Sequence, residues 1–194
     1  MPRTARQLMD FGYYHIITRG NNRRNLFRSQ DDYLFFLRVV DRYLGKFRIL
    51  IFHYCIMPNH VHFLLQVAKA GDLSKFMQGI LQVYASYFRN KYGSAGFLFQ
   101  NRYRSLAIEK ESYLLECARY IERNPLRAGL CDDLFEYPWS SFLSYAEGQM
   151  NQIVKTPDPF YTQLSSRQKN RQLKFINYVL EERPYDQIVD KELS

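Results

Sequence analysis

Two of the four histidines in this chain, His60 and His62, stand two residues apart in the stretch MPNHVHFLL. Side chains alternate between the two faces of a β-strand, so both imidazoles would point to the same side. Their Cβ atoms would then be roughly 7 Å apart, which lets two ring nitrogens converge on one cation. Neutral imidazole is a common metal ligand because it keeps a lone pair at neutral pH. The spacing leaves two interpretations open, a metal site and a pair of histidines exposed on a sheet.

The stretch SYLLECARYIERNP contains groups that could complete such a site. Read as a helix at about 100° per residue, it places one apolar arc toward a sheet: Leu114, Leu115, Ala118 and Ile121. Tyr113, Tyr120 and Asn124 share another arc, where Tyr120 and Asn124 are neighbours. A phenol oxygen can attack phosphorus, and an amide oxygen can join two imidazoles around a metal that polarises a phosphodiester. The alternative is structural: Tyr120 closes the core and Asn124 ends the helix before Pro125.

A zinc-dependent phosphoesterase acting on small molecules is a further alternative, and it needs at least a third protein ligand. His53 stands on the neighbouring predicted strand and could approach His60 and His62. Its surroundings, LIFHYC, indicate a packed core position instead. His15, between Tyr14 and Ile16, is also expected to be structural.

Hydrophobic periodicity predicts the elements that must position these residues. Strands are expected over residues 13–18, 48–56 and 60–67, and at the end of FLFQNRYRSLAIE. Helices are expected from a capping box at Ser29 and Asp32 to Gly45, from an Asp72 cap to KYGSAG, and over residues 112–124. The order β-α-β-β-α-β-α predicts an α+β fold, with a ferredoxin-like split β-α-β antiparallel sheet and an added C-terminal catalytic helix. Two helices would cover one face of the sheet, in contact with these residues: Val61, Phe63, Leu65 and Val67.

Composition suggests one core domain with an extension and a polyanionic partner. The chain has 194 residues, 46% of them hydrophobic, and a formal net charge of +8. A basic balance of this size makes nucleic acid the first partner to consider. From Met150 onward, seven Lys or Arg stand against six Asp or Glu, so the first 149 residues carry nearly all of the excess. We therefore expect a functional domain over residues 1–149 and an extension over 150–194, helical over about 165–182.

The cysteines and the apolar segments favour a cytosolic protein. Cys55, Cys117 and Cys131 are odd in number and lack CxxC spacing, which is typical of a reducing compartment. The N-terminal stretch MPRTARQLMDF lacks the apolar core of a signal peptide. The longest apolar stretches are too short to span a bilayer, so we expect no contact with a membrane.

Four motifs together resemble those of the single-tyrosine HUH transposases: MPNHVHFLL, FQNRYRS, YIERNPLRAGL and YPWSSF. The chain is most similar to the REP-associated tyrosine transposases, a bacterial branch related to insertion-sequence transposases. The resemblance covers about residues 13–145. It implies that His60 and His62 are metal ligands, that Tyr120 is the catalytic tyrosine, and that Asn124 is the third ligand. Tyr113 would be the substitute nucleophile.

The resemblance also implies the chemistry. Such an enzyme uses Mg²⁺ or Mn²⁺ to nick and rejoin single-stranded, hairpin-forming DNA, through a 5′-phosphotyrosine link and a free 3′-hydroxyl. Two imidazoles favour a softer ion than Mg²⁺, so Mn²⁺ fits both arguments. The protein would act as a transposase or endonuclease near the bacterial nucleoid, as a monomer or a homodimer. The alternative is a non-catalytic DNA-binding protein with a regulatory or repeat-maintenance role.

Basic and amide side chains in the first loop, before the fourth predicted strand and on the tyrosine helix are suited to phosphate and base-edge contacts. The candidate DNA-binding residues are Arg19, Asn21, Arg23, Arg24, Arg102, Arg104, Arg119, Arg123 and Arg127.

Overall fold

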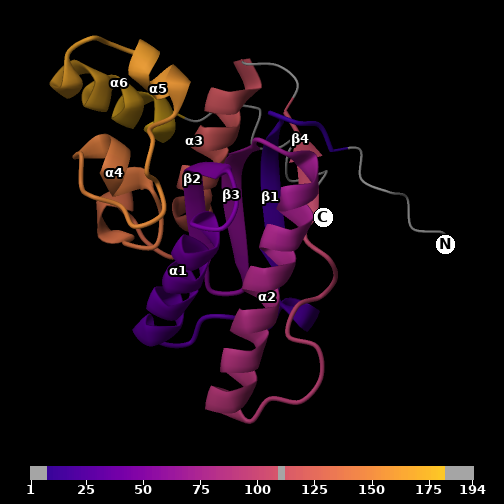
Figure 1. Cartoon of the computed structure of the whole chain (residues 1–194). Coiled ribbons are helices and arrows are strands. Elements are labelled where there is room, and N and C mark those ends of the chain that lie inside the picture. The colour runs from indigo at the N-terminus through magenta and orange to yellow at the C-terminus, as the bar shows by residue number, and fades with distance from the viewer. Residues whose placement is uncertain (1–7, 109–111, 182–194) are drawn as a thin grey trace.

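One antiparallel sheet organises the structure, a computed structural model that describes residues 8–108 and 112–181. Its strands follow the order β2-β3-β1-β4: β1 (Tyr13–Arg19), β2 (Ile49–Met57), β3 (His60–Val67) and β4 (Arg104–Ala107). Helices α1 (Gln30–Leu44) and α2 (Ala70–Tyr92) connect β1 to β2 and β3 to β4, and lie side by side on one face (Figure 1). This order, with antiparallel pairing throughout, confirms the predicted ferredoxin-like fold.

The ends of these helices follow the capping signals in part. Ser29 and Asp32 form the predicted capping box at the start of α1. Asp72 does not cap α2, because the helix begins at Ala70, and the carboxylate lies in the first turn, near the positive end of the helix dipole. Helix α2 ends at Tyr92 and is followed by Gly93, whose φ of 60° lies in the left-handed region that favours glycine.

Helix α3 (Ser112–Arg127) lies on the opposite face of the sheet from α1 and α2. The predicted end of this helix at Asn124 is wrong, since the helix continues through Pro125 to Arg127. Proline lacks the N–H that would bond the carbonyl of Ile121. The side-chain amide of Asn124 donates to that carbonyl at 3.4 Å, which offsets the loss.

The side chains of β3 alternate between two hydrophobic clusters. The cluster beside α1 and α2 holds the residues predicted to face those helices: Val61, Phe63, Leu65 and Val67. The cluster beneath α3 combines Leu64 of β3 with three residues of the predicted apolar arc: Leu114, Ala118 and Ile121. Leu115 is only partly buried, and Cys117 packs in this cluster instead.

The C-terminal part of the chain packs against α3 (Figure 1). Its elements are the 3-10 turn η2 (Leu134–Glu136), α4 (Phe142–Ala146), α5 (Pro159–Gln163) and α6 (Gln168–Leu180). A separate 3-10 turn, η1 (Asn21–Arg23), follows β1. One hydrophobic cluster contains Phe142 and Tyr145 together with Tyr161, Phe175 and Val179, so residues on both sides of position 150 share a core. The domain division at that position stays a prediction, and residues 182–194 of the expected extension lie outside the described residues. None of the described helices is long and apolar enough to cross a membrane.

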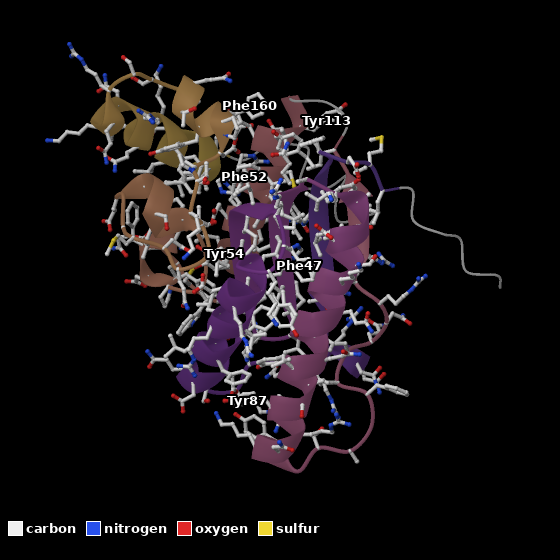
Figure 2. The ribbon with its side chains drawn as sticks, in the orientation of Figure 1. Phe47, Phe52, Tyr54, Tyr87, Tyr113 and Phe160 are labelled. Carbon is white, nitrogen blue, oxygen red and sulfur yellow. The ribbon has the colours of Figure 1, made fainter. Side chains whose placement is uncertain are left out.

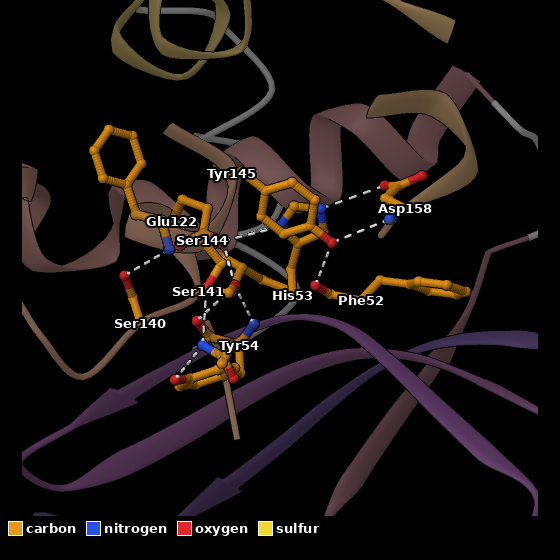
Figure 3. A network of polar contacts seen from close by, with 12 residues as sticks. Phe52, His53, Tyr54, Glu122, Ser140, Ser141, Ser144, Tyr145 and Asp158 are labelled. Carbon is orange, nitrogen blue, oxygen red and sulfur yellow. Dashed lines mark hydrogen bonds and ion pairs between the residues drawn. The ribbon is translucent and has the colours of Figure 1, made fainter. Parts of the chain in front are cut away.

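A buried ion cluster ties β2, α3 and the C-terminal segment together (Figure 3). His53 of β2 is fully buried, as expected, and its Nδ1 lies 2.8 Å from Glu122 of α3. Its Nε2 lies 3.4 Å from Asp158, just before α5. The hydroxyl of Ser141 donates to Glu122, and the main-chain N–H of Asp158 donates to Tyr145. Burial lowers the pKa of His53, but hydrogen bonds and charge from Asp158 and Glu122 outweigh it and raise that pKa to about 9.

This cluster predicts a pH dependence of stability. A raised folded-state pKa means that the native protein holds a proton that the unfolded chain releases. The free energy of unfolding should therefore fall as pH rises from about 6.5 to about 9. In His53→Gln, stability at pH 6.5 should be lower by about 3 kcal/mol, because two buried carboxylates lose their cation. Denaturant unfolding at several pH values measures the free energy of unfolding of the native protein and of His53→Gln. An equally steep decline of this free energy with pH in His53→Gln would contradict the assignment of the pH dependence to His53.

Candidate active site

An open pocket of about 380 Å³ lies between the sheet and the end of α3. It is lined by all four residues that the sequence assigns to a metal site and nucleophile: His60, His62, Tyr120 and Asn124. The histidines come from the start of β3, and the other two side chains come from α3. The face of β3 that carries the histidines and the face of α3 that carries Tyr120 and Asn124 therefore meet within a single chain.

Both imidazoles of β3 are held through their Nδ1 atoms. Nδ1 of His60 lies 2.5 Å from the side-chain oxygen of Asn59, which can only accept. Nδ1 of His62 lies 2.9 Å from Nε2 of His15 on β1. Nε2 of His62 is buried and has no hydrogen-bond partner among the described residues. These contacts leave the Nε2 atoms of both rings for other ligands.

The pocket keeps these histidines uncharged. Burial, with help from the nearby Arg19, lowers the pKa of His60 to about 4. Burial and neighbouring histidines lower the pKa of His62 well below its usual value, and burial lowers that of His15 to about 3. A neutral imidazole has a lone pair at one ring nitrogen, which metal binding requires.

Tyr120 and Asn124 approach the histidines from α3. The ring of Tyr120 stands edge-on to His62, with 5.9 Å between ring centroids, and the guanidinium of Arg127 lies 5.1 Å from its centroid. The side-chain nitrogen of Asn124 donates to the carbonyls of Tyr120 and Ile121, at 2.9 and 3.4 Å. This arrangement occupies the amide nitrogen with main-chain acceptors and leaves the amide oxygen for the pocket. Tyr113 lies near the start of α3 (Figure 2). It is 45% exposed and does not line the pocket.

The donor set suits a cation that accepts nitrogen and oxygen ligands. Within residues 8–108 and 112–181, no group of three His, Cys, Asp or Glu side chains is placed to hold a metal ion. A three-ligand site in this pocket would therefore use Asn124 with His60 and His62. His53, the extra ligand that a zinc phosphoesterase would need, is held between Glu122 and Asp158 and does not line the pocket.

Three of the predicted DNA-binding arginines line the pocket: Arg19, Arg23 and Arg127. Arg19 ends β1 and Arg23 is exposed in η1, so their positive charges lie at the mouth of the site. Asn21 lies in the same turn, and Arg24 donates to Ser94 at 3.0 Å.

Other predicted arginines lie elsewhere. Arg102 and Arg104 are exposed beside or on the edge strand β4, and neither lines the pocket. Arg119 and Arg123 are buried, which corrects the expectation that both face DNA. Their guanidinium groups donate to main-chain carbonyls at the end of α6: Arg119 to Glu181 at 2.7 Å, and Arg123 to Leu180 at 2.5 Å and Val179 at 3.2 Å.

Sequence reasoning missed two residues that hold the imidazoles, Asn59 and His15. Asn59 precedes His60 in the turn, so its contact with His60 could have been predicted from the sequence. The second depends on the register of β1 against β3, which pairs Ile17 with His62 and places His15 diagonally beside it. Alternation along β1 indicates a shared face but not this contact.

Comparisons with known proteins address the family and the fold of the chain. Residues 10–124, more than half of the chain, match the family model described as IS200-like transposase. No curated protein matches the chain. A solved structure of a REP-associated tyrosine transposase bound to a REP hairpin has 19% sequence identity and a TM-score of 0.64, over 81% of this chain and 93% of that one. This likeness shows a shared fold.

Two further solved structures match with lower TM-scores. A Deinococcus radiodurans protein described as a candidate transposase has 19% identity and a TM-score of 0.42, over 63% of this chain and 97% of that one. The tRNA(His) guanylyltransferase of Saccharomyces cerevisiae has 9% identity and a TM-score of 0.47, over 95% and 78%.

The electrostatics of the pocket predict the titration of the histidines. Long-range ¹H–¹⁵N NMR spectra of histidine-labelled protein should show His15, His60 and His62 neutral from pH 8 down to pH 5, because burial disfavours their charged forms. His53 should stay protonated up to about pH 8. A midpoint near 6.5 for any of the three pocket histidines would contradict this description.

Proposed function

This chain is a member of the IS200-like transposase family, and we propose that it cuts and rejoins single-stranded DNA by a tyrosine mechanism. The observation that carries the proposal is the meeting of His60, His62, Tyr120 and Asn124 in one pocket with arginines at its mouth. Neutral nitrogen and oxygen donors can hold a cation, a phenol can act as the nucleophile, and a positive rim can stabilise the negative charge of the phosphate.

The residues that would hold a divalent cation are His60 and His62, through their Nε2 atoms, and Asn124, through its amide oxygen. The buried and unpartnered Nε2 of His62 supports this assignment, because an unmatched polar atom inside a protein is costly. Mg²⁺ or Mn²⁺ would serve, and the two imidazoles favour Mn²⁺. When bound, the ion polarises the scissile phosphodiester and offsets its negative charge.

Tyr120 is the proposed nucleophile. Its phenol oxygen loses a proton and forms a bond to phosphorus, while the bond from phosphorus to the 3′ oxygen breaks and that oxygen gains a proton. The products are a 5′-phosphotyrosine and a free 3′-hydroxyl. Because the new ester keeps the energy of the bond that was cut, a 3′-hydroxyl can later attack it and rejoin strands without ATP.

Hairpin-forming DNA of the REP type is the proposed substrate, and this chain would belong to the REP-associated branch. The relative with the shared fold is bound to such a hairpin. Arg19, Arg23 and Arg127 would contact the phosphates that lead into the pocket. A single chain brings together all the proposed catalytic residues, so we propose that a monomer can act.

A covalent-adduct experiment tests the function. The protein is incubated with Mn²⁺ and hairpin oligonucleotides that carry randomised single-stranded flanks, and adducts are detected by denaturing electrophoresis and intact mass. We expect an adduct with the native protein, loss of it in Tyr120→Phe, and its retention in Tyr113→Phe, which alters an exposed phenol outside the pocket. DNA binding without an adduct would instead indicate a non-catalytic binding protein, and an adduct in Tyr120→Phe would exclude Tyr120 as nucleophile.

A salt titration tests the arginine rim. Arg127→Ala should weaken binding of a hairpin that forms the adduct with the native protein about 10-fold, as expected for one charge-assisted contact. The slope of log K against log salt should become shallower by roughly 0.7 to 0.9, one phosphate contact. Lys155→Ala is the matched control, because Lys155 pairs with Asp41 at 3.0 Å outside the pocket. Equal effects of both substitutions would count against a phosphate-binding rim.

A further inference from the structure

His15 contacts one of the two histidines that the proposed function assigns to the metal. Its Nε2 lies 2.9 Å from Nδ1 of His62, and the two ring planes are inclined by 27° with centroids 5.1 Å apart, so the rings meet edge to edge. Both side chains are buried, at 3% and 2% exposure. The contact is built by the sheet itself, because β1 and β3 are hydrogen-bonded neighbours whose register sets the two residues diagonally.

A hydrogen bond between two neutral imidazoles has a direction. Each ring carries one N–H, so either His62 donates from Nδ1 or His15 donates from Nε2. In the second case the proton of His62 lies on its own Nε2, where no acceptor exists among the described residues. A buried donor without an acceptor costs about 1–3 kcal/mol. In the first case Nε2 of His62 presents a lone pair to the pocket, where a cation would satisfy it.

We propose that His15 is a positioning residue that accepts the Nδ1 proton of His62 and thereby holds the lone pair of His62 Nε2 toward the cation site. The inference rests on the proposed function for the identity of that site. Metal-bound histidines commonly donate their second N–H to a carboxylate or carbonyl, which selects the tautomer and orients the ring. Here a neutral imidazole fills that role, which avoids the cost of a carboxylate buried in the sheet face.

His15 also lies beside the proposed nucleophile. Its ring stands edge-on to Tyr120, with 5.9 Å between centroids, as does the ring of His62. The three rings therefore pack against one another, so the ring that selects the tautomer of His62 also limits how that imidazole can rotate. His15 itself does not line the pocket, so it acts through His62.

The tautomer can be measured without metal or DNA. Long-range ¹H–¹⁵N correlations of histidine-labelled native protein at pH 7 report which ring nitrogen carries the proton. We expect the proton of His62 on Nδ1, and a proton on Nε2 would overturn the proposal. This measurement decides the role of His15 whether or not the protein cleaves DNA.

Metal affinity gives a second readout. Mn²⁺ binding, followed by electron paramagnetic resonance of the free ion, should weaken about 10- to 100-fold in His15→Phe, which keeps a ring but removes the acceptor. His15→Gln should recover most of the loss, because its amide oxygen can accept the same proton. Tyr14→Phe is the matched control on β1, since Tyr14 packs in the cluster on the other face, and it should bind Mn²⁺ as the native protein does.

The outcomes separate the two proposals. Native affinity for Mn²⁺ in a folded His15→Phe, checked by circular dichroism, would overturn the role of His15. Unchanged affinity in His62→Ala would instead overturn the proposed metal site, while the tautomer measurement would still decide which ring donates. If His15→Phe does not fold, His15→Gln and the NMR spectrum of the native protein test the inference.

Discussion

Burial of α3 against the histidine-bearing face of the sheet is the constraint on which the site depends. Side chains that alternate along a strand can contribute to a hydrophobic cluster on each face of the sheet. In β3, Phe63 packs under α1 and α2, and Leu64 packs under α3. The same alternation that puts Leu64 beneath α3 puts His62 there as well. The apolar residues of α3 thus hold Tyr120 and Asn124 over the imidazoles, and the pocket forms where this packing ends.

The C-terminal segment, which runs from η2 to α6, packs against α3 on the side away from the sheet. Arg119 and Arg123 donate to carbonyls at the end of α6, and Tyr178 of α6 donates to Glu116 at 2.8 Å. Glu122 of α3 faces His53 of the sheet, which also pairs with Asp158 of the C-terminal segment. Charges buried in this way are costly when unpaired, so the arrangement favours one docking position for the helix. The segment therefore contributes to the geometry of a site that it does not itself line.

Much of this architecture was predictable because it follows from local periodicity. The alternation of β3, the capping box of α1 and the order of the elements all depend on residues close in sequence, and the structure confirms them. Helix ends were less predictable. The Asn-Pro pair was expected to stop α3, but the side chain of Asn124 bonds the carbonyl that Pro125 leaves unpaired, and the helix continues. Arg119 and Arg123 look like solvent-facing charges until α6 covers them.

The sequence by itself determined which residues share a face: His60 with His62 on a strand, and Tyr120 with Asn124 on a helix, because backbone geometry has a fixed period. Only the tertiary structure decided which faces meet. Strand register placed His15 against His62, and docking of the C-terminal segment placed Asp158 against His53. These contacts join residues far apart in the chain, where no local period applies and only the packing of the whole fold selects the partner.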